Sequence, residues 1–136
     1  MARYLADTSA WHRSLHLEER WNAWIDADEI ALCTPVALEL LWSARSRAEY
    51  RSLEQELSLG FRHLRIDSRA EDAARKAQAA LASSSQHRGP TPVDLLVAAI
   101  AEVNDAVLLH YDRHFDAIAR VTGQPMEWLA PRGSID

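Results

Sequence analysis

Short apolar segments alternate with longer helical segments along the chain. Residues 4–6, 30–33, 61–66 and 107–109 have the length of buried strands, and residues 125–129 are a candidate edge strand. The segments between them carry apolar residues at helical spacing. Strands separated by such helices form parallel sheets through right-handed crossovers. The pattern predicts an α/β fold, a three-layer sandwich with a mostly parallel central sheet of four or five strands.

Capping residues indicate where the helices begin and end. Thr34 is expected to cap the helix TPVALELLWSA and Thr91 the helix VDLLVAAIAEV, each with a proline in its first turn. Asp67 or Ser68 is expected to cap the alanine-rich helix, and Gly60 to end the helix before it. The stretch SSSQHRGPTP is too short for a domain linker. We therefore expect residues 1–136 to form one domain.

The composition of the chain indicates the cellular compartment that we expect. No run of about 18 apolar residues could span a bilayer, and Asp7 lies where a secretory signal would need an apolar core. These features predict a soluble, cytoplasmic protein. Cys33 is the only cysteine, which excludes an intramolecular disulfide and a multi-cysteine zinc site. Its apolar surroundings favour a small core residue over a reactive thiol.

Four acids follow the predicted strands. Asp7 comes directly after residues 4–6, and Asp112 lies just past residues 107–109. Glu39 and Asp94 lie in the first two turns of the helices that begin near residues 34 and 91. Ligands of parallel sheets bind beyond the carboxyl ends of the strands. We therefore expect these four side chains to converge at one edge of the sheet.

Three of these four acids also have a simpler interpretation. Asp7 and Asp112 could be ordinary helix caps, and Asp94 could be half of a capping box with Thr91. Glu39 is different, because leucines flank it within a helix. A lone buried carboxylate costs several kcal/mol without a cation or donor. Either the helix turns Glu39 toward water, or a positive group meets it.

Taken together, the four acids favour a metal. Clustered carboxylates repel one another unless cations neutralise them, and oxygen ligands without imidazole or thiolate suit Mg²⁺ or Mn²⁺. Two such ions would activate a water and stabilise the leaving oxygen of a phosphodiester. On this interpretation Glu39 is buried against a metal.

Motifs across nearly the whole chain resemble a known family. The segments DTS, TPVDLLVAAIAE and LLHYDRHFDAIA, with Glu39 after an apolar strand, resemble PIN-domain ribonucleases, specifically VapC toxins of bacterial toxin–antitoxin systems. The resemblance implies a Mg²⁺-dependent endoribonuclease with Asp7, Glu39, Asp94 and Asp112 as its acidic quartet and Asp116 as a fifth acid. Ser9, which we expect beside the quartet, stands where many members carry Asn, so it keeps a hydrogen-bonding oxygen but lacks the amide donor.

The net charge of −5 at first argues against an RNA partner. Removing the four quartet acids leaves −5 + 4 = −1, and bound divalent ions would bring the balance to neutral or above. Every basic residue except Lys76 is Arg, the side chain that grips phosphate in a bidentate fork, although a genomic bias explains this composition as well. Arg88 and Arg113 are the candidates for RNA phosphate contacts. Surface positions or positions beside the quartet are expected for His12, His16, His87, His110 and His114.

The resemblance also implies a cognate VapB-like antitoxin, whose helix packs in an apolar groove. We assign that groove to Trp21, Trp24, Ile25, Leu53 and Leu57, and expect a homodimer that forms a heterotetramer or larger assembly with the antitoxin. The alternative function is an acid-rich Mg²⁺-binding signalling or protein-binding module without nuclease activity. A receiver-like module would need a lysine after a late strand, whereas Lys76 lies within a predicted helix.

Overall fold

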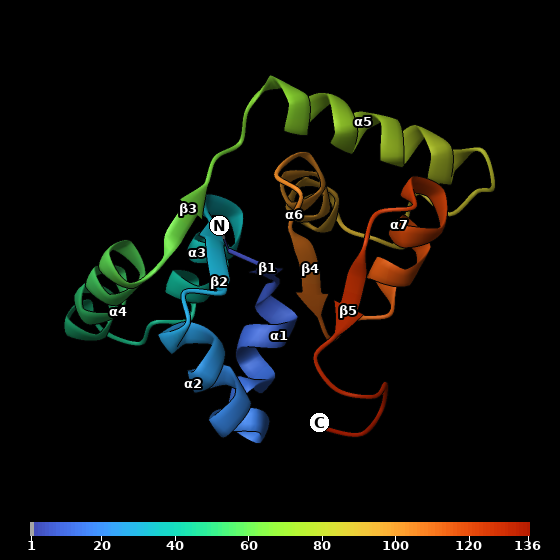
Figure 1. Ribbon diagram of the computed structural model, residues 1–136. Coiled ribbons are helices and arrows are strands. Elements are labelled where there is room, and N and C mark those ends of the chain that lie inside the picture. The colour runs from blue at the N-terminus through green and yellow to red at the C-terminus, as the bar shows by residue number, and fades with distance from the viewer. Residues whose placement is uncertain (1) are drawn as a thin grey trace.

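The computed structural model describes residues 2–136 and is built on one five-stranded sheet. All neighbouring strands are parallel, in the order β3-β2-β1-β4-β5, which confirms the predicted α/β fold (Figure 1). The candidate edge strand is present as β5. The strands are β1 (Tyr4–Ala6), β2 (Ile30–Cys33), β3 (Arg62–Leu64), β4 (Val107–His110) and β5 (Met126–Trp128).

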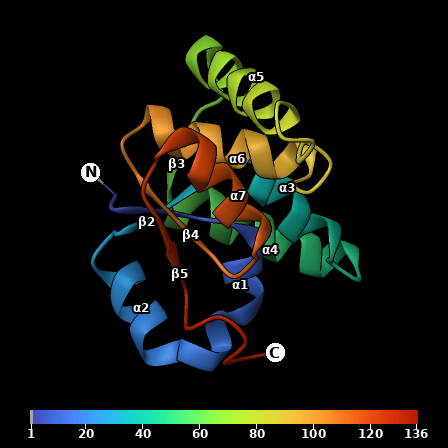
Figure 2. The same ribbon diagram turned by 90° about the vertical axis from the view of Figure 1, so that its right-hand side faces the viewer.

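Helices cover both faces of this sheet. Alternate strand residues point to opposite sides, so Leu5 and Leu108 pack in a large core beneath the later helices, while Tyr4 and Leu109 pack in a smaller core with Trp21 of α2. Figures 1 and 2 show α1 and α2 on the side away from α5 and α6. The helices are α1 (Thr8–Arg13), the 3₁₀ helix η1 (Ser14–Leu17), α2 (Glu18–Asp26), α3 (Thr34–Trp42), α4 (Arg47–Gly60), α5 (Ser68–Ala82), α6 (Pro92–Val103) and α7 (His114–Thr122).

The predicted caps hold for two helices and fail for one. Thr91 caps α6 in a full capping box, and Asp67 caps α5 by accepting a hydrogen bond from the Ala70 amide. Thr34 was expected to cap α3, but it is the first residue of that helix and Cys33 is the cap, without a side-chain bond. Gly60 still belongs to α4, whose C-cap is the extended residue Phe61, and β3 covers only residues 62–64 of the predicted 61–66.

Cys33 is a core residue, as expected. Its side chain is fully buried at the end of β2, and burial raises the pKa of the thiol to about 12. The thiol therefore stays protonated near neutral pH and is a poor nucleophile. Across residues 2–136, no helix combines the length and the apolar character that a membrane crossing requires.

Candidate acidic active site

Three of the predicted acids meet where β1 and β4 end. Asp7 follows β1, its amide donates to the Leu109 carbonyl of β4 at 2.9 Å, and Asp112 lies two residues past β4. Asp94 lies in the first turn of α6. The negative charges of Asp7 and Asp112 both act on the Asp94 carboxyl, which places the three side chains in one electrostatic cluster. The sheet edge therefore carries three acids from separate parts of the chain.

These acids also fix the start of the helices, so the two interpretations from sequence are compatible. Asp7 Oδ2 accepts hydrogen bonds from the Ser9 amide at 3.0 Å and the Ser9 hydroxyl at 2.7 Å. Asp94 Oδ2 accepts from the Thr91 amide at 2.9 Å, and Asp112 Oδ1 accepts from the His114 amide at 2.9 Å. In each carboxylate these bonds use one oxygen. The other oxygen of each can serve a ligand.

Two hydroxyl residues of the DTS segment organise the cluster. Ser9 Oγ donates to Asp7 and also accepts from the Tyr111 amide at 2.9 Å, so it ties the ends of β1 and β4 together. Thr8 Oγ1 donates to Glu39 Oε1 at 2.8 Å, which links α1 to α3. Ser9 was predicted to lie beside the acids. Thr8 was missed, although its position next to Asp7 was a signal that could have found it.

Glu39 is exposed rather than buried, which corrects the expectation for this side chain. The helix turns Val36, Leu40 and Leu41 into the core, and this rotation leaves Leu38 60% and Trp42 88% exposed beside Glu39. Of the three leucines that surround Glu39 in sequence, Leu38 faces water and Leu40 and Leu41 are buried. Glu39 therefore lies at the rim of the acidic edge, held by Thr8.

Burial is the main cause that raises the pKa of the Asp94 carboxyl above its usual value. The hydrogen bonds from Thr91 oppose this shift, and the charges of Asp7 and Asp112 reinforce it. As the side chains stand, no group of three His, Cys, Asp or Glu residues within 2–136 could hold a metal ion. The donors do fit a hard cation chemically, because all of them are carboxylate oxygens and their mutual repulsion is what a cation would relieve.

A fifth acid and a buried histidine flank the cluster. Asp116 Oδ1 accepts from the Trp128 indole at 3.1 Å. His110, the last residue of β4, is fully buried between Phe115 and Trp128, with ring centroids 5.0 and 4.9 Å away. His110 is therefore not at the surface but beside the quartet, the other place expected for it, because it ends a strand that is covered on both faces. Its Nδ1 accepts from the Asp112 amide at 3.2 Å and helps to set that loop.

His110 should make the protein sensitive to acid. Burial lowers the pKa of its imidazole, although the charges of Asp116, Asp7 and Asp112 oppose the shift. Below about pH 6.5 the unfolded chain therefore binds a proton that the folded protein excludes, and stability falls by up to ~1.4 kcal/mol per pH unit. Urea unfolding of His110→Phe between pH 7 and 5 should show a shallower loss of stability than wild type. The same slope in His110→Phe and in the exposed control His16→Phe would contradict this account.

Of the residues predicted to bind RNA or the antitoxin, some are exposed and others are in the core. Arg113 lies at the acidic edge directly after Asp112, and Arg88 is exposed in the segment between α5 and α6. Trp21 and Leu57 are only 5% and 2% exposed and belong to the two cores, so they cannot form the partner groove assigned to them. Trp24, Ile25 and Leu53 are half-buried against the same cores. Helical spacing identified an apolar face correctly but could not distinguish a core face from a partner face.

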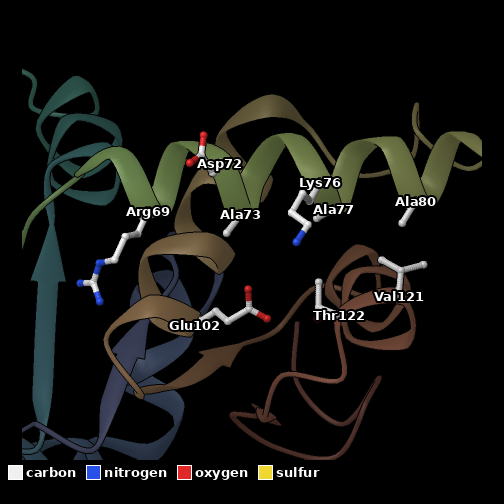
Figure 3. Close-up of a pocket in the computed structure, with 9 residues that line it drawn as sticks. All are labelled: Arg69, Asp72, Ala73, Lys76, Ala77, Ala80, Glu102, Val121 and Thr122. Atoms are coloured by element: carbon white, nitrogen blue, oxygen red, sulfur yellow. The ribbon is translucent and has the colours of Figure 1, made fainter.

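Lys76 lies in a different cavity. This cavity, of about 560 Å³, is bounded by α5, the last turn of α6 and the end of α7, and Lys76 and Glu102 both point into it (Figure 3). Glu102 is eight residues beyond Asp94, about 12 Å along the α6 axis. Lys76 does not line either cavity beside the acidic edge. This placement counts against a receiver-like signalling module.

Known proteins resemble this chain in sequence and in fold. The PIN domain family matches residues 4–121. Ribonucleases VapC18 and VapC51 of Mycobacterium tuberculosis are each 38% identical to it, covering 97% and 98% of this chain and 98% of their own. A DNA-bound VapBC structure from Salmonella typhimurium has the same fold, with a TM-score of 0.74 at 22% identity over 96% of this chain and 100% of that one. The chain therefore belongs to the PIN-domain family and, within it, to the VapC ribonucleases.

Proposed function

We propose that this VapC ribonuclease is a divalent-metal-dependent endoribonuclease that acts on cellular RNA in the cytoplasm as the toxin of a toxin–antitoxin pair. The observation that carries the proposal is the cluster of Asp7, Asp94 and Asp112 at the ends of β1 and β4 and at the start of α6. Such a cluster is electrostatically unfavourable by itself. A cation bound at this edge would relieve the repulsion and would act there on a phosphodiester.

The residues that would hold Mg²⁺, or Mn²⁺ in its place, are Asp7, Asp94 and Asp112, with Glu39 and Asp116 at the rim. Bound divalent ions in such sites supply an activated water and stabilise negative charge on the phosphodiester. The chain itself orients the ligands: Ser9 fixes Asp7, Thr91 fixes Asp94, and the His114 amide fixes Asp112. Thr8 holds Glu39 at the rim, from which a side chain on an exposed helix face can swing inward.

Mapping of new RNA 5′ ends tests this proposal directly. Purified protein is incubated with total cellular RNA, once with Mg²⁺ and once with EDTA. Discrete new ends are expected only with Mg²⁺, because the acids provide no cleavage chemistry without a cation. Absence of new ends with both Mg²⁺ and Mn²⁺ would contradict the ribonuclease function, and equal cleavage in EDTA would contradict the metal dependence.

A second surface beside the acids supports a protein partner. A groove of about 640 Å³, the α3 groove, is lined mainly by apolar atoms of Leu38, Trp42, Ile66 and Leu96, and Glu39 and Thr8 lie in its wall. A Trp that is 88% exposed in the wall of an apolar groove is unfavourable in water and typical of a binding site. Several solved structures of this fold are VapBC or toxin–antitoxin complexes, including VapBC-1 from nontypeable Haemophilus influenzae, with a TM-score of 0.73 at 19% identity over 93% of this chain and 97% of that one.

We assign the α3 groove to the apolar helix of a cognate antitoxin. A helix seated there would bury Leu38 and Trp42 and would bring its flanking residues over Glu39, where a basic side chain would find the acidic edge. This surface replaces the one formed by Trp21 and Leu57, which are in the core. A second copy of this chain is the competing occupant of the α3 groove. The expected homodimer stays a prediction.

A further inference from the structure

On the other side of the acidic edge, a groove is lined by arginines. This arginine groove has a volume of about 460 Å³ and is bounded by α7, the segment 85–90 and Arg132 of the C-terminal tail. Arg113, Arg120 and Arg132 all line it. Figure 2 shows α7 with the loop after α5 and the C-terminal segment on the same side of the molecule. Of these three residues, only Arg113 was predicted from sequence to contact RNA.

The three guanidinium groups are free of carboxylate partners. Within residues 2–136 the ion pairs are Arg62 with Asp28 and Arg69 with Asp67, both away from this groove. Arg120 makes a long hydrogen bond of 3.4 Å to the Gln86 side chain, and the Arg132 guanidinium lies 6.0 Å from the Trp128 ring centroid. Three cations outnumber the one carboxylate of this concave surface, Asp116, which already accepts from the Trp128 indole. In a chain whose net charge is −5, this local excess of positive charge forms a site for an anion.

The arginine groove runs along α7. Arg113 and Arg120 are seven residues apart, so they lie on one helix face about 10 Å apart along the axis. The opposite face of α7 is fixed by Phe115 and Ile118, which are fully buried. Asp116 also lines the groove, and Arg113 follows Asp112 directly. The row of cations therefore begins at the acidic edge and leads away from it along a rigid helix.

We propose that the arginine groove binds the phosphate backbone of the RNA strand on one side of the cleaved bond, an inference that rests on the proposed ribonuclease function. Guanidinium groups bind phosphate oxygens through paired N–H donors, and contacts of this kind position a strand without reading its sequence. Charge decides against an antitoxin segment here, because a basic residue that approaches the acids would be repelled by Arg113, Arg120 and Arg132. The apolar α3 groove has no such barrier.

Salt dependence of RNA binding tests the groove. A fluorescent single-stranded RNA is titrated by anisotropy in EDTA at 50 to 200 mM salt, with Asp94→Asn in every variant to prevent cleavage. Each phosphate contact contributes about 0.7 to the slope of log K against log salt. The slope should therefore be less steep by about 2 in the triple variant R113Q/R120Q/R132Q, which lacks three phosphate contacts. An increase from 50 to 200 mM salt weakens RNA binding by both proteins. The factor of weakening should be about 18-fold smaller for the triple variant than for the parent.

Two matched variants keep this test specific. R20Q/R47Q/R51Q removes the same charge from exposed positions on α2 and α4 and should keep the parental slope. R113K/R120K/R132K should keep the slope as well, because it retains the three charges. Equal slopes for the groove variant and the α2/α4 control, with both proteins folded by thermal melting, would overturn the groove, as would no RNA binding by the parent.

The groove and the ribonuclease function can fail separately. Binding is measured in EDTA, whereas cleavage is measured on wild-type protein with Mg²⁺. Cleavage by wild type with an unchanged slope in R113Q/R120Q/R132Q would overturn the groove alone. A reduced slope without cleavage would support the groove and overturn the proposed ribonuclease function.

Discussion

Replacing Asp94 by Asn is expected to reduce metal-dependent RNA cleavage by at least about a hundredfold, because even residues that only support a metal ligand change activity 10- to 100-fold. The substitution removes a charge from the acidic cluster but keeps the side-chain shape. Asn still offers an oxygen to the Thr91 amide, so the start of α6 should remain intact. Initial cleavage rates on one defined RNA, measured with Mg²⁺, provide the test.

Stability measurements distinguish loss of chemistry from loss of fold. Because burial raises the pKa of Asp94, its charged form destabilises the metal-free protein above that pKa, and this penalty disappears as pH falls toward about 4. Without metal, Asp94→Asn should therefore melt at or above the wild-type temperature at pH 7, and the difference should shrink on acidification. A lower melting temperature at pH 7 would show that the fold is damaged.

The matched control is Asp105→Asn. Asp105 is exposed in the turn after α6, at the end of that helix opposite to Asp94. Its φ of 56° lies in the left-handed region, which Asn tolerates well. This variant should cleave RNA within about twofold of wild type, since surface changes of this kind alter stability by no more than about 0.5 kcal/mol. Wild-type activity in Asp94→Asn would remove Asp94 from the metal site.

Replacing Trp42 by Ser is expected to weaken antitoxin binding by about 30-fold or more. Buried aromatic anchors at interfaces contribute at least about 2 kcal/mol, and Trp42 is the most exposed large apolar side chain of the described residues. Titration calorimetry with a purified cognate VapB-like antitoxin provides the affinity. Melting curves of the free protein should change little, because Trp42 packs against few groups in the folded chain.

Tyr50→Ser is the matched control for Trp42. Tyr50 is an exposed aromatic residue of α4 that does not line the α3 groove, so its loss should leave the affinity unchanged. If Trp42→Ser bound the antitoxin as tightly as wild type but shifted the protein from dimer to monomer by light scattering, the α3 groove would be the interface between copies of this chain. Antitoxin docking would then have to be assigned to another surface.

Sequence patterns determined the architecture well where local signals are strong. The Thr91, Pro92 and Asp94 combination located the start of α6 to the residue, and acids after short apolar segments pointed to one sheet edge. Periodicity could not set the rotation of α3, because apolar residues occur on all its faces and only packing decides that Val36 points inward and Trp42 outward. Trp21 and Leu57 were assigned to a partner groove for the same reason, because periodicity alone does not tell a core face from an exposed face.

Surfaces built from distant segments were the hardest to foresee. Arg113 and Arg120 share a helix face at a spacing of seven, which sequence could have revealed. Arg132 joins them only because β5 pairs with β4 and returns the tail to α7, a pairing for which the short run MEW gives a weak signal. Tertiary placement, rather than any local pattern, assembles the arginine groove.

The hydrogen bonds that Asp7 and Asp94 make at the starts of α1 and α6 also constrain how this gene can lose its toxicity. Each lost cap costs about 1 kcal/mol, out of the 5–15 kcal/mol that holds a typical domain together. An Ala at position 7 would remove the cap of α1, so it would abolish the proposed activity and weaken the fold at once, and the inactive protein would be degraded sooner. Asn would disarm it and preserve the fold. Lineages that keep an inactive but antitoxin-binding copy should therefore retain an amide at position 7.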